Sequence, residues 1–183
     1  MNQINPEPLS SKGRMGMALI TLILVAMWAL AVHAYLTLPH EIPGHFNFDG
    51  EPTRYDTKST VFIIPAAFSI APVIFLLITK YRFILVNRYP YLINLPAFFT
   101  NITKIPEERR GFWVNRYFEA LLYLGVFLTF SLFIMELGIY AGEISGKLPS
   151  WLLPFSLLTP LWLIFPFIFY LAKLSKEMKK EME

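Results

Sequence analysis

The sequence contains no cysteine among its 183 residues, and only 16% of them are charged. The absence of cysteine excludes disulfides, thiolate catalysis and cysteine-liganded metal sites. Charged residues make up about 25% of an ordinary soluble domain, whereas here apolar residues reach 55% of the chain. The composition therefore excludes a disordered chain and an ordinary soluble enzyme, and it leaves an integral membrane protein.

Three long stretches without acidic, lysine or arginine side chains predict transmembrane helices. They are residues 15–38, which contain His33, the segment between Lys58 and Lys80, and residues 148–172. Each exceeds the ~20 residues that cross the hydrocarbon layer, and in lipid the backbone groups must be satisfied within a helix. The first stretch is longer than the apolar core of a signal peptide, about 7–15 residues, so we expect it to be retained.

A further helix is predicted around the uncharged stretch from Ala120 to Met135, which neighbouring apolar residues lengthen beyond Glu119 and Glu136. The predicted fold class is therefore all-α. It is a polytopic membrane protein with four transmembrane helices and a structured extracytoplasmic loop between helices 1 and 2. At the start of the third helix, Arg116 and Glu119 have the i, i+3 spacing of a local ion pair.

Lysine and arginine are unevenly distributed between the two predicted sides of the membrane. Thirteen of the 16 lie on one side, in residues 1–14, 80–116 and 173–183. The other three are Arg54, Lys58 and Lys147. Positive charge accumulates on the cytoplasmic side, so we predict a multi-pass protein of the cell membrane with both termini cytoplasmic and loops 39–58 and 141–147 outside. The lipid bilayer is the expected partner of the basic tail. No nucleic-acid partner is expected, and the oligomeric state stays open.

The chain divides into five predicted segments: a cytoplasmic N-terminus (1–14), helices 1 and 2 with the outer loop 39–58 (15–79), a cytoplasmic interfacial segment (80–112), helices 3 and 4 (113–172) and a basic cytoplasmic tail (173–183). Within the third segment, residues 83–102 are apolar and aromatic, but Pro90 and Pro96 interrupt any spanning helix. This stretch either lies at the membrane interface or re-enters the membrane.

The stretch that includes the predicted outer loop, residues 38–58, is rich in turn formers and polar side chains. Its prolines prevent a long helix and its glycines permit tight turns. His45 and Asn47 can donate and accept hydrogen bonds, Asp49 suits a turn, and Lys58 can reach the surface or a loop carboxylate. Either these side chains satisfy one another in a folded lid, or they bind a peptide, a lipid headgroup or an ion.

An ordered set of residues in this region resembles a known family pattern. The set is Leu38-Pro39, Ile42-Pro43, His45-Phe46-Asn47, Gly50, Pro52 and Lys58. It is similar to the pattern LPxxIPxHFNxxGxP…K of the SdpI-like family of small integral membrane proteins of unknown function, which includes the sporulation-delay toxin immunity type. The resemblance implies an SdpI-like domain over residues 15–79. It also implies a non-enzymatic sensor or immunity protein that binds a peptide, protein or other ligand at its outer face.

His33 and Glu136 are predicted to approach the same level beneath the loop, from the first and third spans. Ionisable groups inside membranes are costly and usually face partners within the bundle. We predict one polar layer in which the two can pair; the alternative is that each reaches the interface independently. The predicted ligand-binding residues are His45, Asn47, Asp49, Lys58, His33 and Glu136, and no catalytic residue is predicted.

A metal site is the rival interpretation of the loop. His40, Glu41, His45 and Asp49 carry ligands that suit Zn²⁺. The two histidines are five residues apart with a proline and a glycine between them, so they cannot form the helical i, i+4 pair of zinc metalloproteases. The sequence therefore favours a protein without a cofactor. A zinc-dependent membrane enzyme or a small transporter is the alternative.

Overall fold

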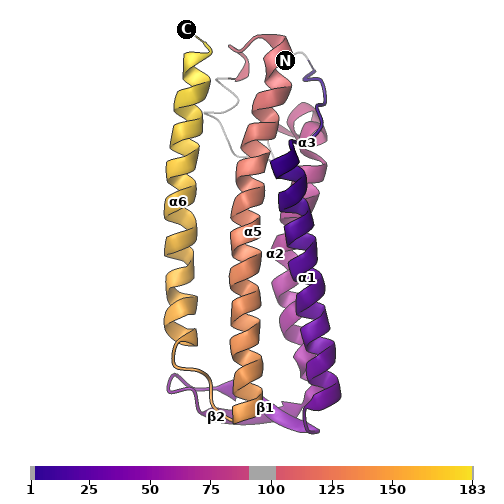
Figure 1. The fold of residues 1–183 in the computed structure, drawn as a ribbon, viewed down its shortest axis with the longest axis vertical. Coiled ribbons are helices and arrows are strands. Elements are labelled where there is room, and N and C mark those ends of the chain that lie inside the picture. The colour runs from indigo at the N-terminus through magenta and orange to yellow at the C-terminus, as the bar shows by residue number, and fades with distance from the viewer. Residues whose placement is uncertain (1–2, 91–101, 183) are drawn as a thin grey trace.

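The computed structural model describes residues 3–90 and 102–182. Its described elements, in chain order, are α1 (Ser11–Thr37), β1 (Glu41–Phe46), β2 (Pro52–Thr57), the short 3₁₀ helix η1 (Lys58–Phe62), α2 (Ile63–Lys80), α3 (Arg82–Arg88), α5 (Glu107–Ser145) and α6 (Leu152–Lys180). Figure 1 shows the four long helices side by side, with both termini at one end and the two strands at the other. We call these the terminal end and the hairpin end.

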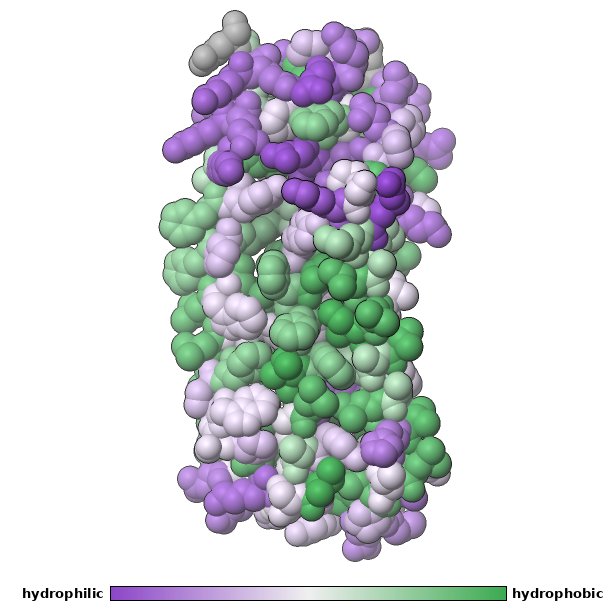
Figure 2. Space-filling view, in the orientation of Figure 1, coloured by the Kyte–Doolittle hydropathy of each residue, from purple (hydrophilic) through white to green (hydrophobic). Residues whose placement is uncertain are grey.

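Four helical segments are long and apolar enough to cross a membrane: Ser11–Thr37, Lys58–Lys80, Glu107–Ser145 and Leu152–Lys180. Figure 2 shows the matching surface, with hydrophobic side chains along the middle of the molecule and hydrophilic ones at both ends. The predicted fold class, with four spanning helices and a structured loop between the first two, is confirmed. The third span, which had the shortest uncharged stretch, belongs to the longest helix.

Helix α5 is the centre of the bundle, because α1, α2 and α6 all pack on it. Its glycines allow close approach: a Cβ atom on Gly125 would lie 2.6 Å from Cγ of Phe75 in α2. The helix continues to Ser145 and ends at Gly146, whose φ of 74° closes the last turn. The connection to α6 therefore begins after Ser145 and ends before Leu152, later in the chain than the predicted loop 141–147.

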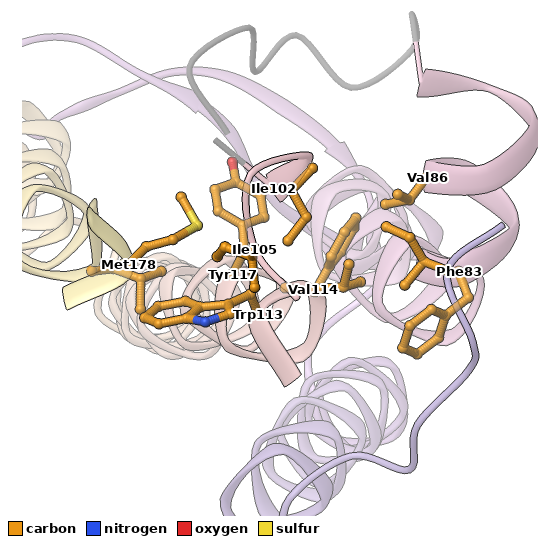
Figure 3. Close-up of a cluster of buried hydrophobic side chains, with 11 residues drawn as sticks. Phe83, Val86, Ile102, Ile105, Trp113, Val114, Tyr117 and Met178 are labelled. Carbon is orange, nitrogen blue, oxygen red and sulfur yellow. The ribbon is translucent and has the colours of Figure 1, made fainter. Parts of the chain in front are cut away.

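The terminal end has a hydrophobic core of its own. Figure 3 shows Trp113, Val114 and Tyr117 of α5 between Phe83 and Val86 of α3 and Met178 of α6. Ile4 from the N-terminal segment also belongs to this cluster. The predicted basic tail forms the last turns of α6, since that helix continues to Lys180. This end is therefore a folded cap on the bundle.

The apolar stretch 83–102 begins in helix α3, which ends at Arg88, two residues before Pro90. A helix that stops there agrees with the expectation that the prolines interrupt a spanning segment. Whether residues 91–101 lie at the interface or re-enter the membrane concerns positions outside the described residues.

The structured loop between the first two spans is a β-hairpin. Strands β1 and β2 pair antiparallel, with Ile42 opposite Asp56, Pro43 opposite Tyr55 and His45 opposite Arg54. The register shifts between Pro43 and His45, so Gly44 is a bulge. The turn formers of this segment predict turns, whereas the two strands were not expected from the sequence.

Candidate functional site

The turn of the hairpin is built by Asn47 and Gly50. The side-chain oxygen of Asn47 accepts hydrogen bonds from the backbone N–H of Asp49 at 3.0 Å and of Glu51 at 2.8 Å. Gly50 donates its N–H to the carbonyl of Asn47 and has a φ of 79°, where a side chain is strained. Asn47 is one of the predicted binding residues. In the structure its amide oxygen stabilises the turn.

The hairpin is fixed to the helices at three points. Ile42 of β1 is buried against Ala34 and Leu38 at the end of α1 and against Val61 of η1. The backbone N–H of Lys58 donates to the carbonyl of His40 at the hairpin base. Near the turn, two contacts join the hairpin to the segment between α5 and α6. The backbone N–H of Leu148 donates to the carbonyl of Gly50 at 2.8 Å, and Nζ of Lys147 lies 3.7 Å from Oε1 of Glu51.

The histidines and carboxylates of the hairpin do not converge. The ring Nδ1 of His45 lies 2.7 Å from the hydroxyl of Thr53 on the opposite strand. His40, Glu41 and Asp49 have exposed side chains; the first two are adjacent at the hairpin base, whereas Asp49 lies at the turn. Within residues 3–90 and 102–182, no three His, Asp or Glu side chains are grouped closely enough to hold a metal ion. The structure therefore does not assemble the four candidate zinc ligands.

Lys58 extends over an aromatic ring. Its Nζ lies 4.9 Å from the centre of the Tyr35 ring, on the outside of α1. No ion pair between Lys58 and a hairpin carboxylate occurs among the described residues. The last residue of the family-like pattern therefore joins the hairpin base to α1.

Beneath the hairpin, His33 and Glu136 contact different groups. The ring of His33 meets the ring of Tyr140 edge-to-face, with centres 6.0 Å apart. The hydroxyl of Tyr140 lies 3.3 Å from that of Thr37. Glu136 is buried, and its Oε2 has no hydrogen-bond partner in the described part of the chain. The structure thus brings His33 to Tyr140, one helical turn from Glu136, and does not pair the two predicted residues.

Tyr140 and Glu143 also belong to this layer, and neither is among the site residues predicted from the sequence. Both line a small cavity together with Glu136, between α5 and the helices α1 and α2. Glu143 falls in the predicted loop 141–147, but α5 continues past it. Positions 136, 140 and 143 have the i, i+4, i+7 spacing of one helix face. The predicted third span already reaches Tyr140, so a longer predicted helix would have added Glu143 to the same face.

A second polar cluster, at the terminal end, fixes the N-terminal segment to the bundle. The buried guanidinium of Arg82 donates to Oδ1 of Asn115 at 2.6 Å and to the carbonyls of Thr79 at 2.9 Å and Glu7 at 2.7 Å. Burial lowers the pKa of Arg82 from its ordinary value, and the charge of Glu119 opposes that change. This cluster has a structural role, because most of its acceptors are backbone carbonyls.

The predicted ion pair between Arg116 and Glu119 does not form. Arg116 Nη2 instead lies 2.7 Å from Glu177 of α6, and Glu119 accepts the backbone N–H of Ser10 at 2.8 Å. Tertiary partners have replaced the local one.

A large cavity lies away from all the predicted site residues. It has a volume of about 650 Å³ and runs between α5 and α6 toward the terminal end, where Lys12 borders it. Its walls are apolar and aromatic, with Phe127, Trp162 and Phe167 among them. Several of its wall residues, such as Phe127, Trp162 and Tyr170, are exposed on the apolar surface of the bundle, and the candidate site stays at the hairpin end.

These features define a multi-pass helical membrane protein with a β-hairpin fixed across one end. Residues 22–68, from the middle of α1 through the hairpin into α2, match a domain of unknown function (DUF1648). An uncharacterized protein of Archaeoglobus fulgidus is 43% identical over 182 residues, which are 98% of each chain. The chain belongs to one family with that archaeal protein. No solved structure matches it.

Proposed function

We propose that the protein is a non-enzymatic sensor or immunity protein of the cell membrane. In this proposal both termini are cytoplasmic, and the hairpin binds a peptide or protein partner outside the cell. The observation that carries it is a hairpin fixed to the bundle that nevertheless presents large side chains to the surroundings. Phe48 at the turn is 90% exposed and Tyr55 of β2 is 59% exposed.

Fixing the hairpin favours binding, because a pre-ordered surface loses less conformational freedom when a partner docks. Exposed aromatic side chains are typical of the residues that dominate protein interfaces. The fold does not need Phe48 or Tyr55 for its core, since neither belongs to the cluster that anchors the hairpin. These two aromatic residues are therefore the first candidates for partner contact.

A peptide suits this surface for a second reason. The described sheet has only two strands, so each strand has one edge whose backbone groups meet no third strand. An extended peptide can add to such an edge through main-chain hydrogen bonds. The resemblance of residues 38–58 to SdpI-like proteins supports the same class of ligand.

The proposed topology rests on the distribution of positive charge. Thirteen of the 16 lysines and arginines belong to the terminal-end segments, and only Arg54, Lys58 and Lys147 belong to the hairpin end. This bias favours a cytoplasmic terminal end. Because the chain has no cysteine, an impermeant maleimide reports only on an introduced one. We expect Asp49→Cys to be labelled in intact cells and Glu108→Cys, exposed near the start of α5, only after lysis; the reverse pattern would refute the topology.

The proposed activity is tested with the sporulation-delay toxin peptide as the probe. Toxin-sensitive bacteria that express the chain should survive the peptide, and the double variant Phe48→Ala/Tyr55→Ala should lose that protection at equal membrane abundance. Phe169→Ala is the matched control, since Phe169 is an exposed aromatic residue on α6 away from the hairpin. Equal sensitivity of cells with and without the wild-type chain would exclude immunity against this peptide.

A further inference from the structure

A small cavity lies directly beneath the hairpin, inside the bundle. Its volume is about 20 Å³, and its polar lining consists of Glu136, Tyr140 and Glu143 of α5. The remaining walls are apolar, with Ala31 and Ala34 of α1 on one side and Val61 of η1 on another. A cavity of this size holds one water molecule or one ion of similar size.

Glu136 is an unusual lining residue because its side chain is only 5% exposed and its Oε2 lacks a hydrogen-bond partner in the described chain. Nearly all buried polar atoms in proteins have such a partner. A buried carboxylate without compensation is strongly unfavourable. An ionisable residue in this setting, within a spanning helix, marks a functional site whose partner must be identified.

Within the described residues, no protein group supplies that partner. Glu143 is the nearest charged group on the same helix face and carries the same sign of charge. The residues that face the cavity from α1, η1 and α2 include no lysine, arginine or histidine. The hydroxyl of Tyr140 lies near Thr37, and its ring contacts His33. Two carboxylates around one apolar-walled cavity repel each other when both are charged, and a cation bound between them relieves that repulsion, which a neutral water does not.

We propose that Glu136 and Glu143 form a binding site for one compact monovalent cation, either a proton or Na⁺. A divalent ion such as Ca²⁺ or Mg²⁺ needs six or more oxygen ligands or several retained waters, which this cavity does not provide. The site goes beyond the proposed partner binding, because it lies inside the bundle. Ala34 and Val61 line it and also hold Ile42 of the hairpin, so its occupancy stabilises the anchor of the hairpin.

The test uses the full chain in lipid nanodiscs, with choline as the inert cation. A cation that binds only the folded state raises the melting temperature. For a proton site, Tm of the wild type should fall as pH rises, Na⁺ should have no effect, and Glu136→Gln should flatten the pH dependence. For a Na⁺ site, Tm should rise with Na⁺ concentration at constant pH, and Glu136→Gln or Glu143→Gln should abolish the rise. Glu108→Gln, an exposed carboxylate on the same helix, is the matched control and should respond as the wild type does.

A second measurement needs no variant, so it decides the question even if the substitutions prevent folding. Dicyclohexylcarbodiimide modifies protonated carboxyl groups in apolar surroundings, and mass spectrometry of the wild type locates the modification. A proton site predicts modification at Glu136 or Glu143 that decreases as pH rises. A Na⁺ site predicts modification that added Na⁺ blocks at constant pH. If modification of both residues and Tm respond to neither pH nor Na⁺, the proposal is overturned.

Discussion

Asn87 pairs with the backbone of Ile4 as a neighbouring β-strand would. The N–H of Ile4 donates to Oδ1 of Asn87 at 2.9 Å, and Nδ2 of Asn87 donates to the carbonyl of Ile4 at 2.9 Å. Eighty-three positions separate the two residues in the chain. One side chain on α3 thus places the buried Ile4 in the hydrophobic core of the terminal end.

Asn87→Ala should release the start of the N-terminal segment. The substitution removes both hydrogen bonds and leaves the Ile4 amide unpaired, which costs about 1–3 kcal/mol locally. We expect faster hydrogen–deuterium exchange in residues 3–10 with little change in α5. Asn5→Ala is the control, because Asn5 is an exposed asparagine of the same segment; equal exchange in the two variants would show that the Asn87 pair does not hold the segment.

Arg82→Lys should destabilise the terminal end although it conserves the charge. The planar guanidinium reaches three acceptors from different elements, whereas an ammonium on a flexible chain cannot match that arrangement. We expect the free energy of unfolding to fall by about 2 kcal/mol, the order of one hydrogen bond to a charged group, measured as a lower Tm in nanodiscs. Arg88→Lys, at an exposed position of α3, should leave Tm within error of the wild type, and a similar loss there would contradict the role given to Arg82.

The C-terminal end of α6 should detach at acidic pH. Hydrogen bonds from Arg109 and Trp113 hold the pKa of Glu181 below its ordinary value. A carboxyl group whose pKa is lower in the folded state stabilises that state above its unfolded pKa, about 4.5 for a glutamate, and the stabilisation is lost as pH falls through the folded value.

We therefore expect exchange near Glu181 to increase below about pH 4.5, where the carboxylate takes up a proton. Glu181→Gln should show the detached state already at neutral pH and little further change on acidification. A pH response that Glu181→Gln retains in full would assign the effect to another group.

The spans could be predicted from the sequence because a bilayer demands long uncharged stretches whatever their neighbours are. The hairpin strands could not be predicted from the sequence in the same way. Three prolines and a bulge at Gly44 disrupt the alternation that predicts a strand, and the hairpin depends on tertiary anchors such as Ile42. Its turn was predictable, since Asn47 and Gly50 act locally.

The candidate site could be predicted only in part, because its contacts also depend on tertiary structure. Glu136 was recognised from its position inside a span, but its neighbours depend on how far α5 extends. The partners of Arg116 and Arg82 come from residues distant in sequence, Glu177 and Glu7 respectively. Local spacing rules such as i, i+3 cannot rank such partners, because the gain of tertiary contacts exceeds the few tenths of a kcal/mol of a surface helix pair.

Gly50→Ala should loosen the hairpin from the bundle. A left-handed φ of 79° is strained for alanine, and the new Cβ would lie 2.9 Å from the carbonyl oxygen of Leu148. Leu148 is the residue whose N–H donates to Gly50 and fixes the turn. Gly146→Ala separates the two effects, since Gly146 has a similar φ of 74° but nothing lies within 4 Å of its Cβ. We expect Gly146→Ala to cost about 1–2 kcal/mol from strain alone, and Gly50→Ala to cost more and to raise exchange across β1 and β2. If both variants show the same Tm and the same exchange in the hairpin, contact with Leu148 does not anchor the turn.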